Sequence, residues 1–312
     1  MARPLRKAVI RAVFLGTPAA ALPSLAALVE VAHVSLVVTR PDRPRGRSGR
    51  PQPSPVKQMA LRLGLPVAQP HKAAELAGRL AEERPDVGVV VAYGLILPPD
   101  ILALPAHGLL NVHFSELPRW RGAAPVERAI LAGDPKTGVA LMVMEQGLDT
   151  GPVIARATTP IFPDETAGDL TERLARMGAA VLQRSLAPYL AGELIPEQQD
   201  EAQATPAPKV TVDEAHIDPA AGAEAVLRAV RAFNPRPGAW GLVEGVRFKA
   251  WEARASAGER MRAGALEWRD GRLLLGTADR PVELTEVQPA GRSRMSGRSW
   301  ALGRRGAAAR LT

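Results

Sequence analysis

Two short stretches of the sequence hold side chains that could act on a carbonyl group. Asn111 and His113 lie at the end of the mostly apolar run 108–113, GLLNVH. Alternate residues of a strand point to the same face, so the two side chains are expected side by side. An amide can donate a hydrogen bond to an oxyanion, and an imidazole can take or give a proton. A lone histidine more often serves structural hydrogen bonds, but the neighbouring Asn111 and the exit loop with Pro118 favour a functional role.

A carboxylate lies in the second stretch, QGLDTGP at 146–152. Gly147 and Gly151 flank Asp149 and mark a tight turn, where a carboxylate can orient a histidine. The alternative is an Asx turn that closes a hairpin. The chain has no cysteine and no evident nucleophile elbow. One Asn, one His and one Asp therefore favour direct displacement at a carbonyl over covalent catalysis.

The elements that must position these residues follow an alternating pattern over residues 1–191. Strands are expected at 8–15, 33–39, 86–92, 108–113, 137–144 and 153–159, and helices at 20–31, 54–63, 73–83, 126–132 and 166–191, the last with a possible break near Gly178. This alternation predicts an α/β fold with an open, Rossmann-like, mostly parallel sheet. Ligands of such sheets bind outside the carboxyl ends of the strands. The turns after Leu15, Ala92 and His113 are therefore the expected site.

The rest of the chain has a different character. Residues 192–209 are polar and contain Pro, which is typical of a linker. A helix is expected at 221–232, and short β-prone runs follow at 241–251, 264–268, 272–275 and 282–287. Their spacing predicts a C-terminal β-barrel, OB-like, over 210–312. The tryptophans of this region could stack on bases, but a small barrel needs bulky core residues, which is the favoured role of Trp240, Trp251, Trp268 and Trp300.

Positive charge is concentrated in two places. The 312 residues carry 40 Lys and Arg against 32 Asp and Glu, and from residue 209 onward the balance is 18 against 12. The segment 40–50, RPDRPRGRSGR, adds five arginines on a Gly- and Pro-rich loop. Such a distribution suits a polyanionic partner, nucleic acid first. A GC-rich genome, which raises Arg content everywhere, is the competing explanation.

Several classes of protein are disfavoured. No apolar run reaches the ~20 residues of a membrane helix, so we expect no membrane association and a cytoplasmic protein. Neither a Walker A pattern nor a G-x-G-x-x-G turn is present. The five histidines are scattered without metal-ligand spacing, so no metal site is expected.

Nine blocks of sequence carry a family resemblance. They are FLGTP (14–18), RPDRPRGR (40–47), PSPVK (53–57), GLPVAQP (64–70), VVVAYGLILP (89–98), NVHFSELPRWRGAAP (111–125), GLDTG (147–151), RAFNPRPGAW (231–240) and VQPAGR (287–292). In this order they resemble the methionyl-tRNA formyltransferases, the tRNA-specific branch of the formyltetrahydrofolate-dependent formyltransferase family. The resemblance spans nearly the whole chain.

The resemblance implies a reaction and a set of roles. A formyl group would pass from the co-substrate 10-formyltetrahydrofolate to the α-amino group of methionyl initiator tRNA. Asn111 and His113 would stabilise the oxyanion, while Asp149 would orient His113 and help to move the proton. The other implied contacts are the folate tetrapeptide Ser115, Glu116, Leu117 and Pro118, the backbone of Tyr93–Leu97 at the pterin, and Arg43, Arg45 and Arg47 at the acceptor end of the tRNA. The barrel would hold the tRNA stem, and a monomer is expected.

Some positions depart from the family pattern. Phe114 stands where a small residue is usual, and Glu116 stands where the tetrapeptide normally has Leu. Burying an unpaired carboxylate is costly. This cost does not arise if the Glu116 side chain points to solvent. Two alternatives remain: a folate-dependent enzyme acting on a small molecule, such as a glycinamide ribonucleotide formyltransferase, or an RNA-binding translation factor with a decayed catalytic domain.

Overall fold

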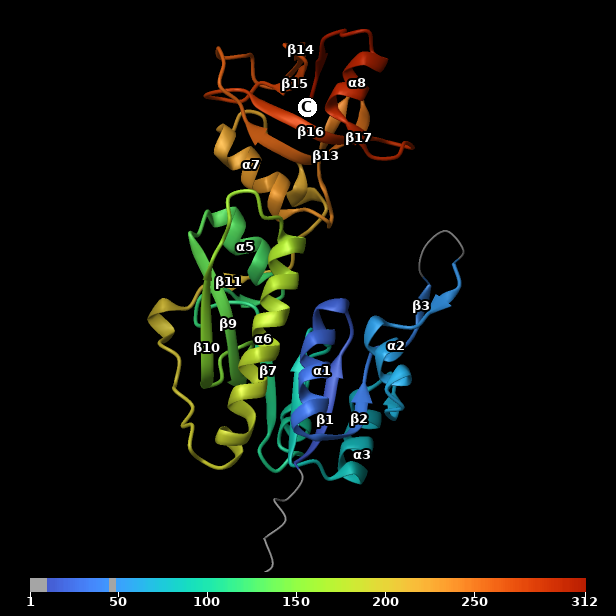
Figure 1. The fold of residues 1–312 in the computed structure, drawn as a ribbon, viewed down its shortest axis with the longest axis vertical. Helices are drawn as coiled ribbons and strands as arrows, with labels where there is room; N and C mark the ends of the chain where they lie inside the picture. Colours follow the sequence, from blue (N-terminus) through green and yellow to red (C-terminus); the bar gives the residue numbers. More distant parts are fainter. Residues whose placement is uncertain (1–9, 45–48) are drawn as a thin grey trace, which may run out of the picture. The chain divides into compact units, whose positions relative to one another are not determined.

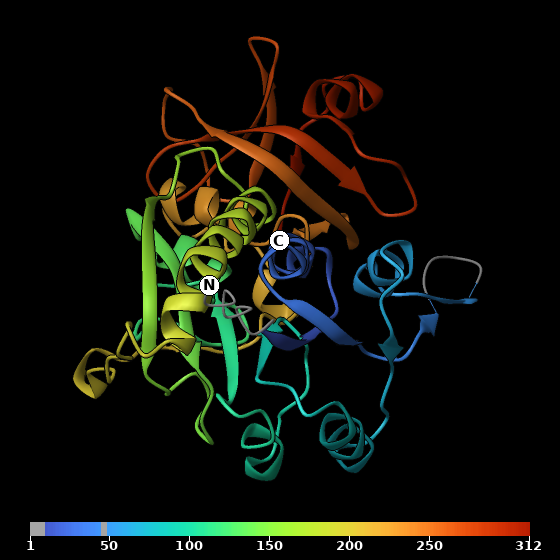
Figure 2. The same ribbon diagram turned by 60° about the horizontal axis from the view of Figure 1, so that its bottom comes forward.

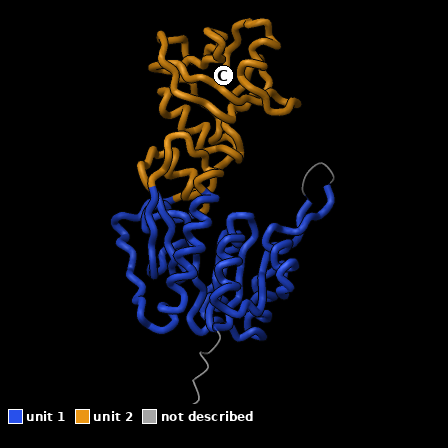
Figure 3. Tube along the Cα trace, in the orientation of Figure 1, with its two compact units in different colours: residues 1–122, 137–159, 171–206 blue, residues 123–136, 160–170, 207–312 orange. Residues whose placement is uncertain are grey.

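The computed structural model describes residues 10–44 and 49–312 (Figure 1). The chain divides into two compact units (Figure 3). The first contains residues 1–122, 137–159 and 171–206, and the second contains residues 123–136, 160–170 and 207–312. The chain therefore passes between the units several times, and neither unit is one continuous stretch of sequence.

The first unit is built on a seven-stranded sheet (Figure 1). In spatial order its strands are β10 (Val153–Pro160), β9 (Lys136–Val143), β7 (Leu109–His113), β6 (Val87–Val91), β1 (Arg11–Gly16), β2 (His33–Val38) and β5 (Val67–Ala68). The pairings from β5 through β7 are parallel, and β7 pairs with β9 in antiparallel register. The predicted mostly parallel α/β sheet is confirmed. Its parallel strands are almost wholly buried, which explains their continuous apolar runs.

Helices cover both faces of this sheet, with α1 and α6 on one side and α3 and α4 on the other (Figure 2). The helices are η1 (Ala19–Ala21), α1 (Leu22–Val31), α2 (Pro55–Arg62), α3 (Ala73–Glu83), α4 (Pro99–Leu102) and α6 (Ala167–Leu190). Leu76 and Leu80 of α3 join Val13 and Leu15 of β1 in a buried cluster. Ser54 caps the start of α2, because its side chain accepts a hydrogen bond from the Lys57 amide.

The break considered near Gly178 is absent, since α6 is continuous from Ala167 to Leu190. A Cβ atom at Gly178 would lie 2.5 Å from Cγ1 of Val112 on β7. The glycine therefore serves close packing of the helix on the strand, which a sequence pattern does not distinguish from a helix break. The same strand carries Asn111 and His113.

The segment from 192 to 206 lies against the first unit over much of its length. The backbones of Glu197 and Val153 form a pair of hydrogen bonds, and Gln199 is buried. The remaining short elements of this unit are β3 (Arg43–Pro44), β4 (Pro51–Gln52), β8 (Arg121–Gly122), η2 (Glu201–Gln203) and β11 (Pro206–Ala207), which extends into the second unit. The polar composition of this segment therefore reflects an ordered extended strip of chain, and three of its side chains recur in the site below.

The second unit contains a closed antiparallel sheet. Its strands follow the order β12 (Ala239–Val243), β13 (Val246–Ala255), β16 (Val282–Pro289), β15 (Arg272–Leu275), β14 (Ala265–Arg269) and β18 (Ala309–Arg310), with β17 (Met295–Ser296) paired to β16. Reciprocal backbone hydrogen bonds between Leu242 and Thr312 join β12 to the end of the chain after β18. The sheet thus closes on itself, and the predicted barrel is confirmed.

The barrel core also takes up helices. The unit includes α5 (Pro125–Ala132), η3 (Asp213–Ala215), α7 (Ala223–Ala232) and α8 (Gly297–Gly303). Trp251 is buried, and the other three tryptophans of this unit are partly buried against the core, in agreement with the favoured core role. The run expected at 241–251 forms two strands, because Glu244 and Gly245 both have positive φ and make a tight hairpin turn.

Candidate active site

Asn111, His113 and Asp149 converge at the carboxyl end of β7. The Asn111 amide donates to Oδ1 of Asp149 at 3.2 Å. Nδ1 of His113 lies 3.6 Å from Oδ2 of the same carboxylate. The side chain of His113 is 6 % exposed and that of Asp149 is 12 % exposed. Asn111 and His113, two residues apart on one strand, thus share the largely buried carboxylate of Asp149. That carboxylate comes from a turn 36 residues after His113.

Both ring nitrogens of His113 face oxygen atoms. Nε2 lies 2.9 Å from the carbonyl oxygen of Trp120, which can only accept a hydrogen bond. Nδ1 faces the carboxylate of Asp149. Nε2 therefore carries a proton that it donates to the Trp120 carbonyl oxygen, and Nδ1 is the ring atom nearest to Asp149. An imidazole and an amide beside one carboxylate are a suitable arrangement for stabilising an oxyanion and for moving a proton.

Asp149 is held in an unusual backbone conformation by its surroundings. Its φ is +54°, a left-handed value that Asp tolerates better than most residues. The Gly122 amide donates to its Oδ2 at 2.9 Å. The Gln199 side-chain amide donates to the carbonyl oxygens of Asp149 and Gly151 at 2.9 and 2.7 Å. A Cβ atom at Gly151 would collide with the carbonyl oxygen of Val143, which accounts for glycine after the Asp-Thr pair.

Arg121 completes the support of this turn. Its Nε donates to Oε1 of Gln199 at 3.0 Å, and its two terminal nitrogens each donate to Glu201 at 2.8 Å. The hydrogen bonds from Glu201 raise the pKa of Arg121, and the charge of Asp149 adds to this effect. Sequence reasoning missed Gln199, Glu201 and Thr205, whose hydroxyl accepts from the Trp120 amide at 2.9 Å. Their only sequence signal was the polar composition that suggested a linker.

The tetrapeptide expected at the folate adjoins this cluster. Ser115 is buried, and its hydroxyl donates to the Arg119 carbonyl oxygen at 2.6 Å. Leu117 packs with Ala140, Met142 and Val153 in a small buried cluster. The carbonyl oxygen of Pro118 accepts from the Thr205 amide at 3.3 Å. The side chains of Ser115 and Leu117 thus face the interior and leave backbone groups for recognition.

Glu116 is neither unpaired nor directed to bulk solvent. The side chain is half-buried, and its Oε1 accepts a hydrogen bond from the Thr158 hydroxyl on β10. Its Cγ lies 2.9 Å from the position that a Cβ at Gly138 would occupy. The carboxylate therefore lies across β9 and β10, and its cost of burial is offset by this contact.

A hollow of about 430 Å³ opens at the carboxyl ends of β1, β2 and β6. Its lining includes Thr17, Arg40, Arg43, Tyr93 and Gly94, each from a segment that follows one of those strands. The Thr17 hydroxyl donates to the Tyr93 carbonyl oxygen at 3.0 Å and ties two of these segments together. The two other arginines predicted to contact the tRNA, Arg45 and Arg47, lie outside the described residues. The hollow opens on the edge of the sheet where parallel α/β folds bind ligands.

The second unit carries a cluster of cations on β13 and beside β17. The Arg294 guanidinium stacks on Trp251 at 3.6 Å from the ring centre, and Lys249 Nζ lies 5.1 Å from the same ring. Partial burial lowers the pKa of Lys249, and the nearby Arg247 and Arg294 lower it further. Glu286 pairs with Arg294 at 3.3 Å, so the cluster keeps a net positive charge. This surface suits phosphate groups.

The described residues hold neither a metal-binding group nor a membrane-spanning helix. Among residues 10–44 and 49–312, no group of three or more His, Asp or Glu side chains is placed to hold a metal ion. Within the same ranges, no helix combines the length and apolarity needed to cross a membrane.

The chain matches two family models. The formyl transferase model matches residues 11–186, and the model of the formyl transferase C-terminal domain matches residues 209–305. A methionyl-tRNA formyltransferase from Halorhodospira halophila is 47 % identical over 299 residues, covering 95 % of this chain and 96 % of the relative. One from Thiobacillus denitrificans is 46 % identical over 303 residues, covering 95 % and 97 %.

Solved structures share the fold at lower identity. HypX from Aquifex aeolicus, in complex with tetrahydrofolic acid, superposes with a TM-score of 0.67 and 20 % identity over 94 % of this chain and 47 % of HypX. A methionyl-tRNA formyltransferase from Clostridium thermocellum superposes with a TM-score of 0.56 and 16 % identity, covering 80 % of this chain and 96 % of that one.

Proposed function

Because the chain belongs to the methionyl-tRNA formyltransferase family, we propose that Asn111, His113 and Asp149 carry out the reaction of that family. The chain transfers a formyl group from 10-formyltetrahydrofolate to the α-amino group of methionyl initiator tRNA, a step of translation initiation. The neutral amine attacks the formyl carbon, the bond from that carbon to N10 of the folate breaks, and the amine proton passes to the departing folate. A tetrahedral oxyanion forms between these events.

Asn111 and His113 stabilise that oxyanion. The Asn111 amide has two N–H groups, of which one is bonded to Asp149 and the other is free to donate to the oxyanion. The His113 ring lies against the same carboxylate and is the second polar group at this place. Asp149 holds both side chains and helps to move the proton from the attacking amine to the departing folate. The shared carboxylate is the single observation that carries this assignment.

The folate is proposed to bind beside the cluster through Ser115, Glu116, Leu117 and Pro118. Inward-facing side chains at Ser115 and Leu117 support recognition by backbone groups, because a pterin presents donors and acceptors that pair well with peptide N–H and C=O. The contact of Glu116 with Thr158 removes the objection that its carboxylate would be buried alone. The backbone of Tyr93–Leu97 is proposed as the opposite wall.

The tRNA is proposed to contact both the arginine loop and the barrel. Arg43 lines the hollow at the carboxyl edge, and we extend the same role to Arg45 and Arg47. In the domain division that we propose, residues 1–191 catalyse with the support of the strip 192–206, and residues 210–312 bind tRNA through the cluster around Trp251. We also propose that the enzyme acts as a monomer in the cytoplasm, since all three catalytic side chains come from one chain and charged tRNA and folate meet there.

Formyl transfer to charged initiator tRNA, with elongator tRNA alongside, tests the proposal. The wild type should formylate the initiator preferentially. Asn111→Ala should lower kcat by about 10²- to 10³-fold, because one oxyanion donor is lost. Asp149→Asn, which tolerates the left-handed backbone, should lower it at least as much while tRNA affinity and melting temperature stay within error. Full activity of either variant would contradict the mechanism.

A further inference from the structure

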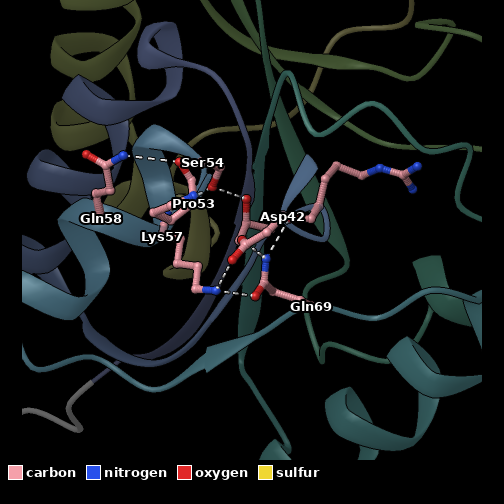
Figure 4. A network of polar contacts seen from close by, with 8 residues as sticks. Asp42, Pro53, Ser54, Lys57, Gln58 and Gln69 are labelled. Carbon is pink, nitrogen blue, oxygen red and sulfur yellow. Dashed lines mark hydrogen bonds and ion pairs between the residues drawn. The ribbon is translucent and has the colours of Figure 1, made fainter. Parts of the chain in front are cut away.

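Three polar side chains form a closed ring of hydrogen bonds where the arginine loop leaves β2 (Figure 4). Lys57 Nζ donates to Asp42 Oδ2 at 2.7 Å and to Gln69 Oε1 at 2.6 Å. Gln69 Nε2 donates to Asp42 Oδ1 at 2.7 Å and to the carbonyl oxygen of Arg40 at 2.9 Å. Each of the three side chains contacts the other two. We call Asp42, Lys57 and Gln69 the clamp.

The clamp is anchored to rigid elements on two sides. Lys57 lies in the first turn of α2, where its amide donates to the Ser54 hydroxyl, and that hydroxyl bonds to Thr39 at the end of β2. Gln69 directly follows β5, which pairs with β2 in parallel register. The only member without such an anchor is Asp42, which lies in the loop itself. The clamp therefore ties a loop residue to the sheet and to a helix.

The part of the loop that follows Asp42 carries the arginines. Arg43 and Pro44 form β3, which pairs with Pro51 and Gln52 of β4. Arg40, whose carbonyl oxygen the clamp holds, and Arg43 both line the hollow at the carboxyl edge of the sheet. The hydrogen bond from Lys57 lowers the pKa of Asp42, so its carboxylate is charged at neutral pH. A fixed loop loses less conformational freedom on binding a phosphate than a free one.

An isolated ion pair between partly exposed side chains, as those of Lys57 and Asp42 are, would contribute little to stability. A stability role also does not require Gln69 to hold the Arg40 carbonyl group. From the closed ring and its place beside Arg40 and Arg43, we propose that Asp42, Lys57 and Gln69 are positioning residues that pre-form the backbone at Arg40 and Arg43 for a phosphate of the tRNA acceptor end. This inference rests on the proposed tRNA contact of Arg43.

Gln69→Glu tests the clamp with a change of one atom. The new carboxylate oxygen would face the Arg40 carbonyl oxygen and Asp42 Oδ1, and neither can donate to it. We expect the KM for charged initiator tRNA to rise about five- to tenfold, because the loop must be ordered at binding. The kcat at saturating tRNA and the KM for 10-formyltetrahydrofolate should stay within about twofold. Asp42→Asn, which removes a negative charge instead of adding one, should act in the same direction with a smaller effect.

Gln58→Glu is the matched control. Gln58 lies on the same helix as Lys57, is exposed, and makes one hydrogen bond to the Pro53 carbonyl oxygen at 3.1 Å (Figure 4). The same chemical change outside the clamp should leave the KM for tRNA unchanged. An equal rise in both variants would show a general effect of negative charge near the loop and would overturn the inference.

The Arg43→Ala background separates positioning from stability. If the clamp acts through Arg43, Gln69→Glu should raise the tRNA KM by less than about twofold in that background. An equal increase in both backgrounds would assign the clamp a structural role only, and so would an unchanged KM for Gln69→Glu alone. If Arg43→Ala itself leaves the KM unchanged, the proposed tRNA contact fails, and the positioning inference fails with it for that separate reason.

Discussion

Asp149 connects the side chains that would act on the formyl group. Its carboxylate accepts from Asn111 and from the Gly122 amide and lies beside His113. A group with so many partners depends on a fixed backbone, and its φ of +54° is maintained by contacts outside the turn. Gln199 supplies two of them through one amide nitrogen. In the mechanism that we propose, catalysis thus depends on a residue, Gln199, that touches no reacting atom.

Gln199→Glu should therefore impair the chemical step. The carboxylate oxygen that replaces Nε2 would face the carbonyl oxygens of Asp149 and Gly151, and the turn would shift. We expect kcat to fall by about tenfold or more, since small displacements of catalytic groups are costly. The KM for tRNA should change little. Gln203→Glu, in the same segment and exposed, is the control, and equal kcat values for the two variants would contradict this role.

Among the helices and strands, those marked by a regular spacing of apolar residues could be predicted from the sequence. The apolar runs predicted the longer strands of both units, while the two-residue strands such as β5 and β18 were not predicted. The spacing of Asn111 and His113 correctly indicated a shared face, because both side chains reach Asp149. Close approaches could not be predicted in the same way. The packing of Gly178 on β7 and the contacts of Gln199 join residues distant in sequence, and local patterns contain no signal for them.

Gly178→Ala tests the contact between α6 and β7. Alanine favours an isolated helix by up to ~1 kcal/mol, which predicts stabilisation if packing is unimportant. Because the new Cβ would meet Val112 at 2.5 Å, we expect the melting temperature and kcat to fall instead. Adding Val112→Ala should restore part of the kcat by making room. A melting temperature above that of the wild type in the single variant would refute the packing argument.

The distribution of charge along the chain agrees with the proposed roles of its two parts, catalysis by the first and tRNA binding by the second. The chain from residue 209 onward carries 18 of the 40 basic residues and 12 of the 32 acidic ones. Many of these arginines are paired with neighbouring carboxylates, as Arg269 is with Glu267 and Arg280 is with Glu224. The cluster around Trp251 keeps an excess of cations, which makes it the preferred phosphate contact.

The salt dependence of tRNA binding measures how much the cations around Trp251 contribute to that binding. Replacing Arg247, Lys249 and Arg294 together by Ala should reduce the slope of log Kd against log salt by about 2–3, because each cation that contacts a phosphate releases about one counterion. Replacing the ion-paired Arg269, Arg272 and Arg280 removes the same charge elsewhere and should change the slope much less. Equal slopes for the two triple variants would assign the effect to net charge alone.

The strip of chain between residues 192 and 206 sets where the protein can be divided. A fragment that ends at residue 191 would retain Asn111, His113 and Asp149 but would lose the amide that fixes the Asp149 turn and the hydroxyl that holds Trp120. A recombination junction placed there would separate the reacting side chains from their support. A transplantable catalytic module must therefore extend through residue 206, and gene fusions that preserve activity should have their junctions beyond it.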